Sequence, residues 1–239
     1  GTRSERGRGY RECHAHRNKV ILGQDLNVGE DIVNAMRAHP TDAELQRYAC
    51  AALRNIAINN RNKEILGRDL NVGEDIANAM RAHPTNAELQ TKACGALANL
   101  AENNRNQEIL GQDLNAGKHI VNAMRAHPTD AELQTEACAA LRNIAVNSRN
   151  QEILGQDLNA GKHIVNAMRA HPTNAELQTQ ACRALRELAH NGRNKKILGQ
   201  DLNVGEDIVN AMRTHSTNAE LQTNACGALW NLAANDRNK

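Results

Sequence analysis

The stretch ILGQDLN at residues 109–115 decides the fold, because it returns along the chain at a fixed interval. With Gln or Arg at its fourth position, the same string occurs five times in the 239 residues. Its last residue falls at Asn27, Asn71, Asn115, Asn159 and Asn203, so the step is always 44 residues. A constant period of this length is typical of a stacked solenoid, in which one unit cannot bury its apolar face alone.

The repeat also predicts the domain organisation. Residues 20–239 divide without insertion into five units, namely 20–63, 64–107, 108–151, 152–195 and 196–239. Because no linker separates the units, we predict one cooperative solenoid over residues 17–239. Residues 1–16 align by period with 45–60, but Gly, Glu and Arg stand there in place of apolar residues. We therefore expect a flexible, degenerate N-terminal segment.

Each unit is predicted to hold three helices, with the first unit as the example. A short first helix is expected over 17–23. The second opens after Asn27, a plausible N-cap, and ends at His39-Pro40, because a residue before proline avoids the α region. Thr41 and Glu44 have the spacing of a capping box, which predicts a long third helix over about 41–58.

Composition and charge limit the function classes. The chain has 29 Lys+Arg against 27 Asp+Glu, so no basic excess favours nucleic acid. No apolar run approaches the roughly 20 residues of a membrane span, and the N-terminus lacks the apolar region of a signal peptide. We expect a soluble intracellular protein. One cysteine per unit on the buried side of the third helix favours a reducing compartment, the cytoplasm or nucleus.

The third helices carry the motif L-x-N-[IL]-A in four of the five units, at 53–57, 97–101, 141–145 and 229–233. In the fourth unit Glu187 replaces its Asn. A short first helix, a Gly at the start of the second and this motif in the third resemble the armadillo repeat over all five units. The resemblance implies an all-α fold, a right-handed α-solenoid of three-helix repeats. The alternative is a HEAT-type helix pair, which would lack the separate first helix.

Armadillo proteins bind extended peptides along a concave groove lined by third helices, so the resemblance implies a peptide- or protein-binding scaffold. Their groove Asn pairs with the peptide backbone, and that role carries over to Asn55, Asn99, Asn143 and Asn231. The Trp array with which some members sandwich lysine side chains is missing here, because Ala, Gly or Arg stands in those places. A receptor for nuclear localisation signals is therefore not expected.

Comparison of the units with one another identifies a variable surface. Units three and four differ at eight of 44 positions, and four of these follow the spacing 3, 4, 3 of one helix face. We call the corresponding residues of all units the third-helix stripe: Tyr48, Ala51, Asn55, Ile58; Lys92, Gly95, Asn99, Glu102; Glu136, Ala139, Asn143, Val146; Gln180, Arg183, Glu187, His190; Asn224, Gly227, Asn231, Ala234.

We interpret the third-helix stripe as the partner-binding face. The alternative is neutral drift of an exposed face, against which stands the recurrence of Arg37, Gln46 and Asn62 in every unit. Large residues such as Arg183 and Trp230 are also of the kind enriched at binding hot spots. The candidate contact residues are Tyr48, Asn55, Lys92, Asn99, Glu136, Asn143, Arg183, Glu187, His190, Trp230 and Asn231.

No catalytic, cofactor or metal site is predicted. The recurring histidine, His39 in the first unit, comes once per unit and cannot gather the four ligands of a zinc site. It is expected at a helix end, near the negative end of the dipole. The run 13–16, Cys-His-Ala-His, has metal-ligand residue types but no partners. Because no phosphate loop or hydrolase motif is present, we expect no enzyme.

Three further possibilities stay open. Some helical solenoids bind RNA, but the stripe charges are mixed. The near-identical units also permit a designed or purely structural scaffold with no natural ligand. Finally, neither end of the array carries a polar cap, so head-to-tail stacking of chains, unit five against unit one, is expected through complementary end faces.

Overall fold

The computed structural model describes residues 27–234, and every regular element in this range is helical. The second helices of the units are α2 (Val28–Ala38), α5 (Val72–Ala82), α8 (Ala116–Ala126), α11 (Ala160–Ala170) and α14 (Val204–Thr214). The third helices are α3 (Ala43–Ile56), α6 (Ala87–Leu100), α9 (Ala131–Ile144), α12 (Ala175–Leu188) and α15 (Ala219–Ala233). None of the described helices is both long and apolar enough to cross a membrane.

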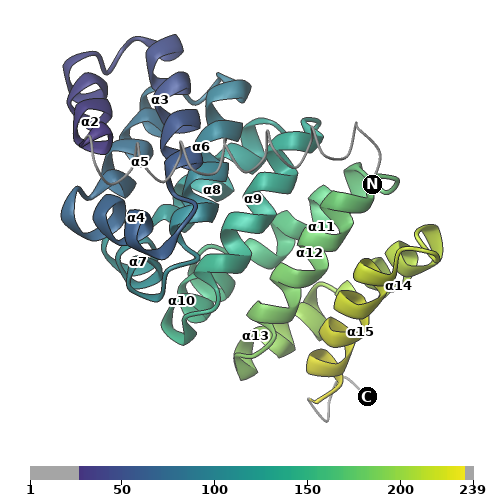
Figure 1. The fold of residues 1–239 in the computed structure, drawn as a ribbon. Helices are drawn as coiled ribbons and strands as arrows, with labels where there is room; N and C mark the ends of the chain where they lie inside the picture. The colour runs from purple at the N-terminus through teal and green to yellow at the C-terminus, as the bar shows by residue number, and fades with distance from the viewer. Residues whose placement is uncertain (1–26, 235–239) are drawn as a thin grey trace, which may run out of the picture.

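The helices stack as a repeat solenoid. Each third helix packs against the next, and each second helix packs against its own third helix and the following second helix. Figure 1 shows the third helices succeeding one another from α3 to α15 across the molecule. The stack therefore has a layer of third helices and a layer of second helices, with the apolar core between them.

The first helix of each unit is a short α-helix that runs directly into a π-helical turn. The pairs are α4 (Asn60–Glu64) with η1 (Ile65–Asp69), α7 (Asn104–Glu108) with η2 (Ile109–Asp113), α10 (Ser148–Glu152) with η3 (Ile153–Asp157), and α13 (Gly192–Lys196) with η4 (Ile197–Asp201). The sequence predicted the existence of this helix but not its π-helical second half. The corresponding segment of unit one, predicted at 17–23, lies outside the described residues, as do residues 1–16.

A buried asparagine explains the Gly of the repeated string. Asn150 donates from Nδ2 to the backbone oxygen of Gln107, 2.7 Å away in the preceding unit, and to that of Ile144. Its side chain lies directly over Gly111, where a Cβ would overlap it. Only glycine permits this approach of α10 to η2.

The start of the second helix differs from the prediction. Asn71, like its counterparts in the other units, has a positive φ, here 52°, and its side chain makes no cap hydrogen bond. Asn is one of the few residues that adopts the left-handed region without high cost, so it serves the chain reversal between first and second helices. The predicted N-cap residue, Asn27, and the predicted helix start are therefore correct, but the side-chain hydrogen bond that an N-cap usually accepts is not formed.

The third helix begins one residue later than a capping box at Thr41 requires. Asp42 is the N-cap, and its carboxylate accepts hydrogen bonds from the backbone N–H groups of Glu44 and Leu45. In the other units the side-chain oxygen of the corresponding Asn or Asp accepts one such bond, from the backbone N–H of the Leu three residues later; these caps are Asn86, Asp130, Asn174 and Asn218. The predicted pairing of Thr with Glu is wrong, because the Asp or Asn that follows the Thr accepts the hydrogen bonds of the first turn.

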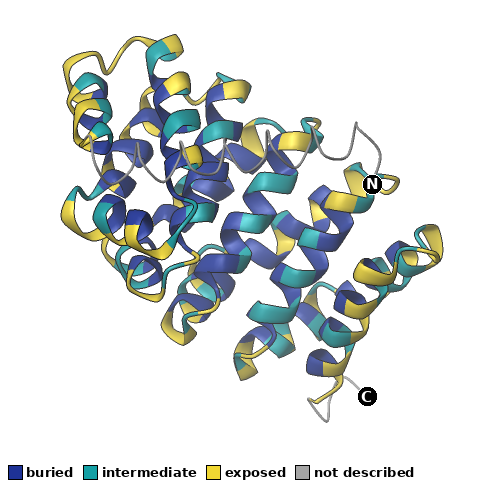
Figure 2. Ribbon diagram, viewed as in Figure 1, coloured by how far each residue is buried: buried dark blue, intermediate teal, exposed yellow. Residues whose placement is uncertain are grey.

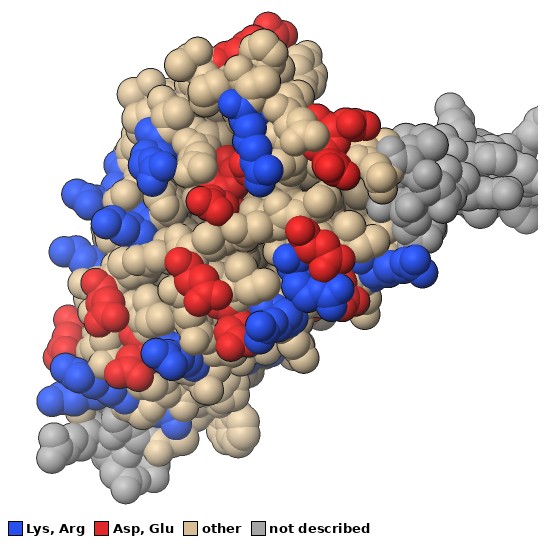
Figure 3. Space-filling model, turned by 90° about the vertical axis from the view of Figure 1, so that its left-hand side faces the viewer, with Lys and Arg blue, Asp and Glu red and all other residues tan. Residues whose placement is uncertain are grey.

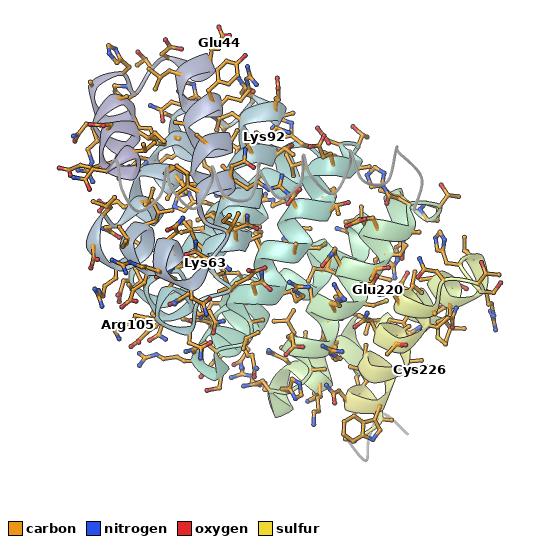
Figure 4. The ribbon with its side chains drawn as sticks, viewed as in Figure 1. Glu44, Lys63, Lys92, Arg105, Glu220 and Cys226 are labelled. Atoms are coloured by element: carbon orange, nitrogen blue, oxygen red, sulfur yellow. The ribbon has the colours of Figure 1, made fainter. Side chains whose placement is uncertain are left out.

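Aliphatic residues and cysteines fill the core. Cys50, Cys94, Cys138 and Cys182 are fully buried, as predicted, whereas Cys226 on α15 is exposed. Figure 2 shows the buried residues on the inner sides of the helices, and Figure 4 shows Cys226 on the side of α15 away from α12. Leu229 beside it is half-buried. Head-to-tail stacking through this face stays a prediction.

Truncation of the core should cost far more stability than truncation of the third-helix stripe. Leu141 is fully buried, so Leu141→Ala is expected to lower the free energy of unfolding by about 2–5 kcal/mol. Tyr48 is 59% exposed, so Tyr48→Ala should change it by less than about 1 kcal/mol. Chemical denaturation of both variants measures the difference, and similar losses would place Tyr48 in the core.

Thiol reactivity should follow burial. Desolvation raises the pKa of the Cys50, Cys138 and Cys182 thiols to about 12 and also raises that of Cys94, so these groups carry almost no thiolate in mildly alkaline buffer. In a Cys13→Ser chain, a disulfide reagent should react rapidly with Cys226 alone, and Cys226→Ser should remove that reaction. Rapid reaction of a second thiol before denaturant is added would contradict the packing.

Candidate functional site

Three of the four stripe residues in each unit lie on helices α3, α6, α9, α12 and α15, as the sequence predicted. The fourth lies in the turn after the helix, because the third helix of unit one ends at Ile56 and not near residue 58. The members also differ in exposure. Among the candidate contact residues, Tyr48, Asn55, His190 and Trp230 are exposed, Lys92, Asn99, Glu136, Arg183 and Glu187 are half-buried, and Asn143 and Asn231 are buried. The second group lines the surface without projecting from it. The stripe is thus a shallow surface with a few prominent side chains.

Three side chains on this surface are large, apolar and exposed. Tyr48 is 59% exposed, Val146 is 52% exposed and Trp230 is 75% exposed. Among residues 27–234 these are the only large hydrophobic side chains with such exposure. Tyr48 and Val146 belong to the stripe, and Trp230 adjoins its Asn231. They lie in units one, three and five, so they mark separate points along the layer of third helices and do not form one patch.

The asparagines of the stripe hold neighbouring third helices together. Asn99 donates from Nδ2 to the backbone oxygen of Arg54, 2.9 Å away on α3. Asn143 and Asn231 donate in the same way to Ala98 at 2.8 Å and to Arg186 at 3.1 Å. Each bond reaches back to the preceding unit and uses one of the two N–H groups of the amide. Asn99 can offer its second N–H and its side-chain oxygen to a partner, whereas the oxygen of Asn143 accepts from Arg142.

Most charges of the stripe are already paired within the molecule. Lys92 contacts Glu132 at 3.0 Å and Arg183 contacts Glu220 at 2.6 Å, and both pairs join consecutive third helices. Figure 4 labels Lys92 on α6 and Glu220 on α15. Glu136 forms an ion pair with Arg54 at 2.6 Å. Glu187 forms one with Arg186 at 3.0 Å and lies 3.7 Å from His190. The surface therefore presents both signs of charge in short alternation.

Arginines next to the stripe asparagines extend across the stripe and contact side chains of neighbouring third helices. Arg54 on α3 lies over Gly95 on α6, where a Cβ would meet its guanidinium, and reaches Glu136 on α9. Arg142 has only amide partners, Asn143 and Gln180. Burial, followed by the nearby Arg183, lowers the pKa of Arg142. A desolvated guanidinium with neutral partners is suited to receive an acceptor group from a ligand.

The comparisons with known proteins identify the repeat. The family model described as LRRK2 ARM repeat matches residues 16–197 and, in a second alignment, residues 58–238. The chain belongs to this armadillo-repeat family. It is similar to the crystal structure of an engineered protein, with 26% sequence identity and a TM-score of 0.73, covering 92% of this chain and 89% of that chain. No curated protein matches the chain.

The recurrence of Arg37, Gln46 and Asn62 does not distinguish a binding face from a drifting surface, contrary to the prediction. Gln46 and Asn62 recur in every unit, but they are 2% and 0% exposed and are not surface positions. Gln46 donates to the backbone oxygens of Met36 and His39, which joins the second helix to the third. Arg37 is half-exposed but pairs with Asp75. Their recurrence reflects structural bonds, so it does not count against drift of the stripe.

The recurring histidines also have a structural partner that the sequence did not predict. His127 contacts the backbone oxygen of Pro84 through Nε2 at 2.8 Å, and the same bond joins His83, His171 and His215 to the proline of the preceding unit. In the sequence, only the constant separation of 43 residues between each His and the preceding Pro could have indicated this bond. No cluster of three metal-ligating side chains occurs among residues 27–234.

The same Asn position should have unequal effects on stability in different armadillo units. Asn143→Ala removes the bond to Ala98 and leaves Arg142 without its Oδ1 acceptor, so a loss of about 1–3 kcal/mol is expected. Asn55 is exposed, so Asn55→Ala should cost less than about 0.5 kcal/mol. Urea denaturation of the pair tests this. Equal effects would mean that the inter-unit bond is not formed in solution.

Proposed function

We propose that this armadillo chain is a binding scaffold that recognises an extended peptide or protein segment along the third-helix stripe. The exposure of the Tyr48 and Trp230 side chains along the layer of third helices carries the proposal, because exposed aromatic residues of this kind are enriched at binding hot spots. Tyr and Trp anchors joined by adaptable polar groups suit a partner of mixed chemistry. Binding rather than catalysis is the inferred role.

An extended partner suits the arrangement of the polar groups. Asn99 keeps one N–H and its oxygen for a peptide bond, which has one acceptor and one donor to match. Asn55 at the first unit is exposed and can act in the same way. At the fourth unit the carboxylate of Glu187 accepts but cannot donate, so this position should favour a Lys or Arg of the partner. Several modest contacts in successive units then sum to useful affinity.

The charge pattern supports a protein partner over RNA. RNA binding by a solenoid needs a continuous basic surface with aromatic stacking. The stripe instead alternates Lys92, Glu136, Arg183 and Glu187 across its units. Figure 3 shows Lys and Arg interspersed with Asp and Glu over another side of the molecule as well. A purely structural or designed scaffold is the other alternative. The similarity of the chain to an engineered protein is consistent with it.

A library of extended peptides separates these possibilities. Peptides selected on the native chain should lose about tenfold or more in affinity when Trp230→Ala and Tyr48→Ala are combined, because both exposed anchors are removed. Arg149→Ala, an exposed position on α10 outside the stripe, is the matched control and should leave affinity within about twofold. Fluorescence polarisation gives the affinities.

Two results would count against a peptide scaffold. Selection of no peptide above background would favour the ligand-free structural scaffold. Tighter binding of a single-stranded RNA than of any selected peptide, with strong salt dependence, would favour the RNA-binding alternative.

A further inference from the structure

A second set of sites lies in the layer of second helices, away from the third-helix stripe. Between each second helix and the next is a small cavity, which we call a notch, lined by the Arg near the end of one helix and by the first turns of the following helix. The four notches differ in one residue pair. Glu and Asp are the third and fourth residues of α5 and α14, whereas Lys and His are the third and fourth residues of α8 and α11.

The two outer notches are filled by a carboxylate of the chain itself. Arg37 donates from Nε and Nη2 to the two oxygens of Asp75 at 2.9 and 3.0 Å. Arg169 forms the same fork with Asp207 at 2.8 and 2.9 Å. The Asp75 side chain is only 7% exposed in this position. Two parallel charge-assisted bonds of this kind are the preferred way for a guanidinium to hold a carboxylate.

The two inner notches have the guanidinium but lack the carboxylate. In the described part of the chain, Arg81 has only the amide oxygen of Asn78 as a side-chain partner, at 2.8 Å, and Arg125 forms no ion pair. The inner notches measure about 410 and 280 Å³, against about 220 and 230 Å³ for the outer pair. The inner notches are thus both unneutralised and more open.

The charges at each inner notch are all of one sign. Arg81, Lys118 and His119 line the first, and no Asp or Glu joins them. Arg125 and His163 line the second, with Lys162 next to His163. Burial, then the neighbouring Arg and Lys, lowers the pKa of His119 and of His163. An anion bound here would relieve that repulsion and favour the protonated imidazole.

We propose that the notches at Arg81 and Arg125 bind the carboxylate side chains of an acidic segment of a partner protein. The ligand's Asp or Glu takes the place that Asp75 and Asp207 hold in the outer notches, with the same fork to the guanidinium. The two sites are one unit apart on the same layer, so a single acidic segment can occupy both. This site is independent of the third-helix stripe, and either can fail without the other.

The outer units supply the variant that tests the proposal. Lys118→Glu with His119→Asp gives α8 the acidic pair of α5 and α14. The new carboxylate at position 119 should then pair with Arg81 and occupy its notch. An acidic peptide of about ten Asp and Glu residues, fluorescein-labelled, is the probe, and its affinity should fall about tenfold. Lys196→Glu with Arg193→Gln changes the net charge equally on α13 and should alter affinity by less than about twofold.

The inner histidines add a second readout. Affinity of the native chain for the acidic peptide should rise as the pH falls toward and below 6.5, because the pKa of His119 is lowered from that value in the free chain and the bound carboxylate favours its protonation. The rise should be smaller in the Lys118→Glu/His119→Asp chain. A thermal melt no lower than that of the native chain shows that this variant folds.

Three outcomes would overturn the proposal. The first is equal affinity of the native and Lys118→Glu/His119→Asp chains for the peptide. The second is an equal loss in the Lys196→Glu/Arg193→Gln control, which would mean that only net charge matters. The third is more effective competition by phosphate than by carboxylate. If a single-stranded RNA or inorganic pyrophosphate displaces the labelled peptide at a lower concentration than an unlabelled acidic peptide does, the notches bind phosphate groups.

Discussion

The bonds from side chains of one unit to backbone carbonyls of the unit before it hold this solenoid together. Asn150 reaches Gln107, His127 reaches Pro84 and Asn143 reaches Ala98, at 2.7–2.8 Å. The partners are 43, 43 and 45 residues apart, so all three sets of bonds form together only when the units keep a constant length. An insertion of even one residue between partners would shift a buried amide away from its acceptor and leave it unpaired. The constant step of 44 residues follows from this constraint.

Because the acceptors are backbone atoms, the bonds do not depend on which side chain stands at the acceptor position. Lys63, Gln107 and Gln151 all accept through their carbonyl oxygens from the Asn of the following unit. The surface side chains can therefore change while the stack stays the same. This separation of scaffold from surface is what lets the armadillo units carry different residues on the third-helix stripe and in the notches.

The sequence predicted the large features because they depend on periodic patterns. The period predicted the solenoid, and the His-Pro step predicted the end of the second helix. The spacing of the apolar residues predicted the buried faces. It failed where two residue types compete for one local role. Asn27 was assigned as an N-cap and stands at that position through its positive φ, without a side-chain cap bond, and Thr41 was assigned as the cap that Asp42 provides.

The candidate site was predictable as a surface but not in its contacts. Spacing alone placed the stripe on one helix layer, whereas the bond from Asn99 to the preceding helix joins atoms 45 residues apart and depends on how the helices stack. Likewise, Gln46 and Asn62 were taken as surface positions because they are polar. Their burial follows from the carbonyl groups they satisfy, which a sequence does not display.

We propose that this scaffold binds its extended partner along the third-helix stripe. Hydrogen–deuterium exchange on the chain with and without its tightest-binding peptide measures this most directly. Binding along the stripe should slow exchange in the segments of α3, α6, α9, α12 and α15 that carry it, over several consecutive units. Protection confined to the second helices, or to a single unit, would contradict it.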